Sequence, residues 1–226
     1  MTNVIILAAG EGKRIGQPKA LLPHKGATLL ENVISIYSSF NPVTPSSNPV
    51  TPSSNSIILN EVKNLSFSPT ALMIKTIIAV INRKVADELI KASIFCELEN
   101  KGILFVINDQ VEKGQLHSIH LGIQALDQSE AGILLHPVDH PFVQTATIRT
   151  MLEHYAPDRI IIPTHQGRRG HPPCFGVETI PFLFDAPFDE GARWVYRTHP
   201  DRIDHLDVSD PGILMNVNTM DDLTIS

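Results

Sequence analysis

The chain has 226 residues, of which 42% are hydrophobic and 19% are charged, and its formal net charge at pH 7 is −6. This length and composition predict one globular domain with a substantial core, and they exclude a fibrous or wholly disordered chain. A negative charge without any block of like charge also excludes generic nucleic-acid binding, which needs a broad basic surface.

Signals for targeting and for disulfide bonding are weak. Cys96 and Cys174 are too few for a disulfide framework and form no C-x-x-C pair, so we expect a reducing compartment. The N-terminal apolar run stops at Ala9 with no basic region ahead of it, which is too short for a signal peptide or a membrane span. These features predict a cytoplasmic protein without a membrane partner.

Strand and helix patterns alternate along most of the chain, which is typical of an α/β domain with a mainly parallel sheet. The expected strands are nearly continuous in apolar character, as strands covered on both faces are, at residues 3–8, 75–81, 103–107, 131–137 and 159–163. The expected helices have apolar residues at helical spacing, at residues 27–40, 84–93, 115–127, 144–155 and 190–198. Ligands of such sheets bind beyond the carboxyl ends of the strands.

Residues 41–70 interrupt this alternation. The heptad NPVTPSS at 41–47 recurs without change at 48–54. Its prolines, serines and asparagines favour extended or disordered backbone, and a loop of about 30 residues is uncommon within a compact α/β unit. We therefore expect a flexible, low-complexity insertion within one domain that spans 1–226. A binding arm or lid is the functional alternative.

The first strand runs directly into a loop rich in glycine and cations, in the sequence VIILAAGEGKRIGQPKALLP at 4–23. Glycines permit positive φ angles and a close approach of the backbone to a ligand, while cations balance the charge of a polyphosphate. The glycines are Gly10, Gly12 and Gly16, and the cations are Lys13, Arg14 and Lys19. The combination predicts a site for a nucleoside triphosphate, and a solvated strand-to-helix turn is the alternative.

Two well-known glycine loops do not match this one. The phosphate loop G-x-x-x-x-G-K-[ST] fails because Ile15 stands five residues after Gly10 and Arg14 follows the Gly12-Lys13 pair. The dinucleotide fingerprint G-x-G-x-x-G fails because the third glycine falls at 16 where 15 is needed.

The segment LAAGEGKRIGQPKALL instead resembles the signature L-A-A-G-x-G-x-R-x-G-x-x-K of the MobA-like nucleotidyltransferases, most of all the molybdenum-cofactor cytidylyltransferases. The resemblance implies a single three-layer Rossmann-like domain of the nucleotide-diphospho-sugar transferase type. It also implies catalytic roles for Arg14 and Lys19 at the phosphates. The nucleotide-binding residues that it implies here are Leu7, Ala8, Ala9, Gly10, Gly12, Arg14 and Lys19.

Asp139 follows a buried strand in LLHPVDHPFV at 134–143 and precedes a helix pattern, so it either caps that helix or holds Mg²⁺. The resemblance favours the metal, because the family's Asp-x-Pro aspartate binds magnesium there and is catalytic. The flanking His136 and His140 suggest another enzyme class, since HPVDH could be part of the zinc motif H-x-H-x-D-H. Val138 stands where that motif needs its second histidine.

The segment MNVNTMDDL at 215–223 is, by its chemistry, a polar turn that opens a short helix. It resembles the family's closing motif N-V-N-T-P-E-D-L, with Met220 in place of the proline and Asp221 in place of the glutamate. The resemblance implies that Asn218 supplies a second metal contact. Asn216 is the alternative if the register of the turn differs.

Two segments could contact the second substrate. GRRGHPPCFG at 167–176 is either a tight turn between strands or a stiff loop that presents donors to a ligand. It resembles the family's acceptor-side segment G-x-x-G-H-P-x-x-F, and DEGAR at 189–193 resembles its G-A-R segment. The resemblance implies acceptor contacts by Gly170, His171 and Arg193.

The segment KGQLHSIHLGIQAL at 113–126 is predicted to be an amphipathic helix that begins near Gly114. Ser118 and His117 near its start either donate to a nucleobase or ribose or remain solvated. The segment resembles the family form G-x-x-x-S-x-x-x-G, which implies a nucleotide contact for Ser118.

Taken together, these resemblances imply an enzyme that uses Mg²⁺ to move a nucleoside monophosphate, CMP from CTP, onto molybdopterin or a related phosphorylated acceptor. The resemblance also implies transient contact with a molybdoenzyme or its chaperone. A guanylyl- or sugar-phosphate nucleotidyltransferase is one alternative. A catalytically inactive, nucleotide-binding regulatory module is the other.

Overall fold

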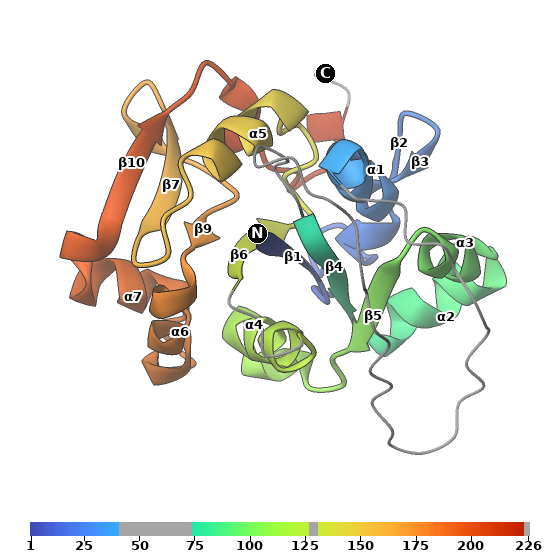
Figure 1. The fold of residues 1–226 in the computed structure, drawn as a ribbon. Coiled ribbons are helices and arrows are strands. Elements are labelled where there is room, and N and C mark those ends of the chain that lie inside the picture. Colours follow the sequence, from blue (N-terminus) through green and yellow to red (C-terminus); the bar gives the residue numbers. More distant parts are fainter. Residues whose placement is uncertain (41–73, 127–130, 224–226) are drawn as a thin grey trace, which may run out of the picture.

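The computed structural model describes residues 1–40, 74–126 and 131–223, and the insertion expected at 41–70 lies outside them. Eight described strands form one sheet in the order β10-β7-β9-β6-β1-β4-β5, with β8 paired to β7 (Figure 1). The strands are β1 (Thr2–Ala8), β4 (Ile74–Ile81), β5 (Ile103–Ile107), β6 (Gly132–Pro137), β7 (Ile160–His165), β8 (Arg168–Arg169), β9 (Cys174–Phe175) and β10 (Ile203–Asp207). Within the described part of this sheet, only the short strands β8 and β9 pair in antiparallel fashion, so the predicted mainly parallel sheet is confirmed.

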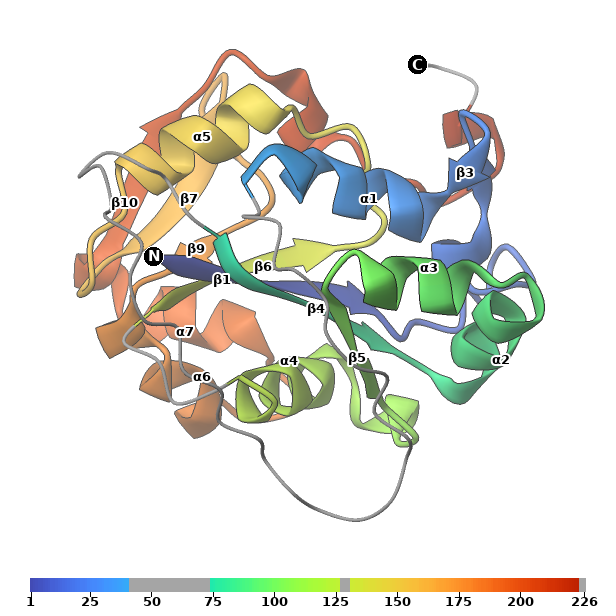
Figure 2. The same ribbon diagram turned by 45° about the vertical axis from the view of Figure 1, so that its right-hand side comes forward.

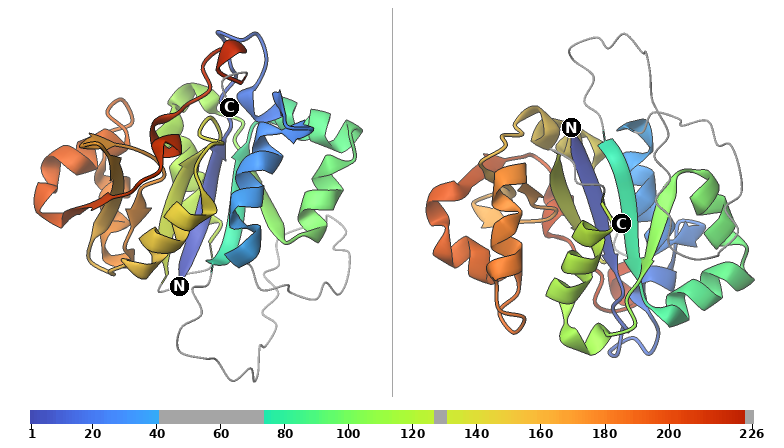
Figure 3. Two further views of the ribbon diagram at one scale, coloured as in Figure 1. Left: turned by 90° about the horizontal axis from the view of Figure 1, so that it is seen from above. Right: turned by 60° about the horizontal axis from the view of Figure 1, so that its bottom comes forward.

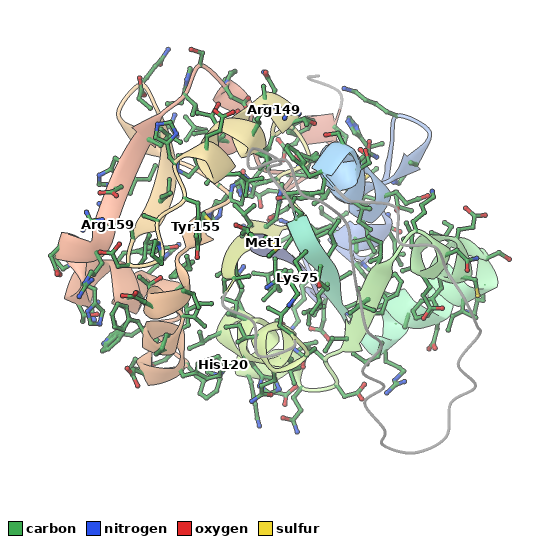
Figure 4. The ribbon with its side chains drawn as sticks, viewed as in Figure 1. Met1, Lys75, His120, Arg149, Tyr155 and Arg159 are labelled. Carbon is green, nitrogen blue, oxygen red and sulfur yellow. The ribbon has the colours of Figure 1, made fainter. Side chains whose placement is uncertain are left out.

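Helices cover both faces of the sheet, which gives the three layers visible in Figure 2. One face carries α1 (Leu29–Tyr37), α2 (Arg83–Lys91), α3 (Ile94–Asn100) and α5 (Thr145–Glu153). The other carries α4 (Gln115–Gln124), α6 (Pro181–Asp185) and α7 (Ala192–Thr198). In Figure 4, Arg149 on α5 and His120 on α4 mark these two layers.

Strand β1 contributes side chains to both halves of the core, one on each face of the sheet. Because successive side chains point to opposite faces, Val4 and Ile6 join the cluster under α1 and α5, while Ile5 and Leu7 join the cluster under α4. All of these side chains are buried. A strand buried on both faces reads as a continuous apolar run, and this is the pattern from which it was predicted.

The expected elements agree with the structure except at some boundaries. The first expected helix is shorter than 27–40, because residues 27–28 form β3, which pairs with β2 (Pro23–His24), and residues 38–40 form a 3₁₀ turn. Helix α1 begins at a capping box in which Thr28 accepts from the Glu31 amide and Glu31 accepts from the Thr28 amide. The sequence did not predict α3, α6, β10 or the short strands.

Strand β10 was not predicted from the sequence because it lies at the edge of the sheet. Ile203 is buried, but Asp204, His205 and Asp207 are exposed, so the strand lacks the continuous apolar character of its neighbours. Its order comes from parallel pairing with β7, which is a contact between distant segments.

The carboxyl ends of the parallel strands share one edge of the sheet. In the left view of Figure 3, the N-terminus lies at the opposite end of β1 from the C-terminal turn and the β2–β3 hairpin. No helix in the described part of the chain is long and apolar enough to cross a membrane.

Candidate functional site

A cavity of about 280 Å³ opens at this edge, between the glycine loop after β1, the end of β6 and the start of α4. Its walls combine backbone, small side chains and a few polar groups, which is typical of a ligand site. The lining residues are Leu7, Ala9, Gly10, Glu11, Gly12, Lys19, Val111, Gly114, Gln115, Ser118, Pro137, Val138 and Asp139.

The glycine loop owes its shape to two residues with positive φ. Gly12 has φ +63°, and a Cβ on it would lie 1.8 Å from the carbonyl oxygen of Gln17, so no larger residue fits. Gly16 has φ +80°, and both its amide and that of Ile15 donate to the Gly12 carbonyl at 2.9 Å. Gly10 does not have a positive φ, but it lines the cavity.

Lys19 joins two side chains that are far away in sequence. Its Nζ donates to Oδ2 of Asp139 at 2.8 Å and to Oδ1 of Asn218 at 3.0 Å. The side chains of Lys19 and Asp139 are 21% and 24% exposed, so this ion pair is partly shielded from water. Three of the residues singled out in separate sequence motifs therefore meet at one point.

The C-terminal turn is held in this place by backbone contacts of its own. The Val217 amide donates to the carbonyl oxygen of Asp139 at 2.8 Å. Asp222 accepts from the amides of Asn218 and Thr219, both at 2.8 Å, and these two hydrogen bonds lower the pKa of its carboxyl group. Asn216 is exposed on the same turn, so the register directs Asn218, not Asn216, toward Asp139.

Asp139 does not cap the following helix. Helix α5 begins at Thr145, six residues later, and the carboxylate at its start belongs to Asp210, which accepts from the Gln144 amide and the Thr147 hydroxyl. The capping alternative for Asp139 is therefore wrong. Its carboxylate faces the cavity beside Lys19.

Most of the expected nucleotide-binding residues line the cavity, namely Leu7, Ala9, Gly10, Gly12, Lys19 and Ser118. Ala8 does not, because it points to the opposite face of β1, into the core that α1 covers. Arg14 does not line the cavity either, and its side chain is exposed on the outer part of the loop. Ser118 is buried, and its hydroxyl accepts from the Asn108 amide group at 2.9 Å.

His136 is a structural residue. Its Nε2 contacts the carbonyl oxygen of His140 at 2.9 Å, and its Nδ1 contacts the Tyr37 hydroxyl at 2.5 Å. Complete burial lowers the pKa of His136 to about 3, so the ring is neutral. Among the described residues no group of three or more His, Cys, Asp or Glu side chains could hold a metal ion, so the zinc alternative is wrong.

The expected acceptor residues divide into a partly buried pair, Gly170 and His171, and the exposed Arg193. The Gly170 amide donates to Pro163 and the His171 amide to Ile213, which fixes the loop between them. The His171 ring lies 4.4 Å from that of His140, and burial lowers the pKa of His171. Arg193 is exposed at the start of α7, and its charge also lowers the pKa of His171.

The two arginines of GRRG belong to a hairpin and not to the cavity. Strand β7 turns through Gln166 and Gly167, both with positive φ, into β8, where Arg168 and Arg169 are exposed. The tight-turn alternative is therefore correct for this part of the segment.

Two asparagines at strand ends were missed by the sequence analysis. Asn82 follows β4, and its amide group donates to the carbonyl oxygen of Ala9 at 2.8 Å. Asn108 follows β5, is completely buried, and donates to Ser118. Both line a second cavity of about 270 Å³ beside the first. The signal was available, because both are polar residues directly after an apolar strand, like Asp139.

A divalent metal ion fits the donor set around Lys19. Asp139 offers a carboxylate and Asn218 an amide oxygen, and one cation, the Lys19 ammonium group, already lies between them. Mg²⁺ in proteins is commonly bound by one or two carboxylates together with substrate phosphates and water. Two protein oxygens at the edge of an open cavity match that pattern.

Comparison with known proteins decides the family. A family model described as the MobA-like NTP transferase domain matches residues 4–203. The chain belongs to this family. Family membership, the fold of this type and nucleotidyl transfer as the class of reaction are thereby confirmed. The curated relative nicotine blue oxidoreductase of Paenarthrobacter nicotinovorans is 25% identical over 229 residues, which cover 97% of this chain and 93% of the relative.

Two solved structures share the fold of this chain. The Methanothermobacter nucleotidyl transferase Mth528 has a TM-score of 0.67 and 20% identity, over 99% of this chain and 94% of its own. Rv0371c of Mycobacterium tuberculosis H37Rv, solved in complex with manganese, has a TM-score of 0.63 and 18% identity, over 99% and 96%.

Proposed function

We propose that this MobA-like chain transfers CMP from CTP to a molybdopterin-type acceptor, with Mg²⁺ as cofactor and pyrophosphate as the second product. The observation that carries the proposal is the meeting of Lys19, Asp139 and Asn218 beside the glycine loop. Carboxylate, amide and ammonium groups at one end of a cavity are suited to a triphosphate and its metal ion.

In the proposed reaction an oxygen of the acceptor phosphate attacks the α-phosphorus of CTP in line. One P–O bond forms, the bond between the α-phosphorus and the bridging oxygen breaks, and pyrophosphate leaves. The nucleophile is already an anion, so no general base is needed. The residues position the two substrates and balance the charge that develops between them.

Each group of the site has a role in that scheme. Asp139 and Asn218 would hold Mg²⁺, which supplies charge neutralisation on the phosphates when it is bound. Lys19 and the backbone N–H groups of the glycine loop bind the phosphate oxygens. Arg14 lies on the exposed part of the loop and reaches the phosphates only when its side chain turns inward.

The preference for CTP is supported by Ala9. The cytidylyltransferases that the chain resembles have alanine at this position, where the guanylyltransferases have glycine. The Ala9 side chain lines the cavity, and its carbonyl oxygen is held by Asn82. A methyl group on this wall takes space that a purine would otherwise use.

The acceptor is proposed to lie on the side of Gly170, His171 and Arg193. Arg193 is exposed and bears the positive charge that a phosphorylated acceptor needs, while Gly170 and His171 sit on a loop fixed by backbone hydrogen bonds. Delivery of the product would require transient contact with a molybdoenzyme or its chaperone, in the cytoplasm.

Pyrophosphate release from CTP, GTP, ATP and UTP, each with Mg²⁺ and molybdopterin, tests the proposal. We expect release with CTP, and a loss of roughly 10²-fold or more in Asp139→Ala, as for other lost stabilisers of transition-state charge. Release with another nucleotide would show that the chain is a guanylyl- or other nucleotidyltransferase. Nucleotide binding without any release would favour the inactive regulatory module, and unchanged turnover in Asp139→Ala would end the metal assignment.

A redox reaction is the second candidate, because the similarity to nicotine blue oxidoreductase covers nearly the whole chain. The bleaching of nicotine blue by an added hydride donor in the presence of the protein tests it. Bleaching would assign a redox activity to this chain, and absence of bleaching would remove this candidate.

A further inference from the structure

Lys19 occupies the position that a metal ion on Asp139 and Asn218 needs. Its Nζ is 2.8 Å from one oxygen and 3.0 Å from the other, whereas Mg²⁺ binds oxygen at about 2.0–2.1 Å. The two oxygens would have to close in by less than about 1 Å each. An ammonium group and a metal ion cannot both use the same lone pairs, and their like charges repel strongly at this range.

We propose that Lys19 is the resident cation of this metal site, which neutralises Asp139 and keeps a metal ion out until a triphosphate draws the ammonium group away. The proposal rests on the proposed roles of Asp139 and Asn218. It adds an order to binding, because the metal ion enters with the nucleotide and not before it.

The structure allows the exchange without a change of fold. Lys19 begins a three-residue 3₁₀ turn. A flexible stem of four carbons joins its ammonium group to the backbone, so the charge can move while the backbone stays in place. The same side chain lines the cavity in which the phosphates would lie. A triphosphate therefore offers the ammonium group new anionic partners, and this makes nucleotide and metal binding mutually favourable.

The two oxygen donors stay in place when Lys19 leaves. The turn that bears Asn218 is joined to Asp139 by the Val217 amide, and its own amides are held by Asp222. Loss of the ammonium group therefore removes a competing charge but leaves the arrangement of the donors. For this reason we expect replacement of Lys19 to strengthen the binding of a metal ion in the absence of nucleotide.

The test is a titration of the nucleotide-free protein with Mn²⁺, in which the free ion is measured by electron paramagnetic resonance. Lys19→Met should bind Mn²⁺ at least tenfold more tightly than the wild type. Lys13→Met is the matched control, because it removes the same charge from the same loop, and Lys13 is exposed and paired with Glu11 at 3.1 Å. Lys13→Met should bind Mn²⁺ like the wild type.

Three results would overturn the proposal. These are equal or weaker Mn²⁺ binding by Lys19→Met, an equal gain in Lys13→Met, and a gain that persists when Asp139→Ala is added to Lys19→Met. Circular dichroism checks folding, and Lys19→Gln replaces Lys19→Met if the latter does not fold. The titration involves no turnover, so a gain in Lys19→Met alone would support the resident cation even if no nucleotidyl transfer were found.

Discussion

At the scale of single residues, the C-terminal turn gives two identical side chains different surroundings. Asn218 accepts from Lys19 beside Asp139, whereas Asn216, two residues earlier, is exposed. Both side chains have the same size and polarity, so any difference between their variants reports position alone. The pair therefore offers a direct test of the second metal contact.

We expect Asn218→Ala to reduce turnover by about 10- to 100-fold, the usual cost of losing a group that orients or supports a metal ligand. The Mg²⁺ concentration for half-maximal rate should rise, because an oxygen donor is lost. Asn216→Ala should leave both quantities unchanged. Steady-state rates over a range of Mg²⁺ check this, and equal effects in the two variants would contradict the assignment of Asn218.

At the scale of elements, helix α4 depends on the absence of a side chain at Gly122. A Cβ there would lie 2.6 Å from Cγ2 of Ile5 and 3.2 Å from Cγ2 of Val80, in the sheet below. Leu116 and Ile119 pack against the same face of the sheet. The close approach of α4 to β1 brings Ser118 to the cavity wall.

Gly122→Ala should lower the free energy of unfolding, because overpacking a core usually costs about 1–3 kcal/mol. Alanine favours a helix over glycine by about 0.8–1.0 kcal/mol, which reduces the loss but does not cancel it. Gln124→Ala, exposed on the same helix, is the control and should have little effect. Urea denaturation measures both, and equal stabilities of the two variants would argue against close packing of α4.

At the scale of the whole molecule, buried histidines connect stability to pH. His136 lies between the hydroxyl of Tyr37 on α1 and the loop after β6, and burial lowers its pKa to about 3. Burial, with the neighbouring His171, also lowers the pKa of His140 to about 4. Both rings stay neutral in the folded protein at pH values where the unfolded chain binds protons.

The stability contributed by these neutral rings is complete above pH 6.5 and is lost as the pH falls from 6.5 toward the lowered pKa values. Within that window, each ring lowers the free energy of unfolding by about 1.4 kcal/mol for every pH unit by which the pH falls. Urea midpoints at pH 7 and pH 5 should therefore differ in the wild type and differ less in His136→Gln. A midpoint that falls equally in both proteins would show that His136 is not the group responsible.

The sequence by itself determined the features that depend on neighbours along the chain. The glycine loop, the apolar strands and the amphipathic face of α4 follow from local spacing, and the place of Asp139 at the cavity follows from its position two residues after β6. These were predictable because backbone geometry and side-chain periodicity act over a few residues.

Only the tertiary structure decided which distant groups meet. Lys19 reaches Asp139 across 120 residues of sequence and Asn218 across 199, and no local pattern encodes such distances. The same holds for the edge strand β10, which is ordered by pairing with β7, and for Asp210, which takes the capping role that was the alternative for Asp139. Local spacing fixes each segment, but packing of the segments on the sheet decides which charges share a site and which side chain faces the ligand.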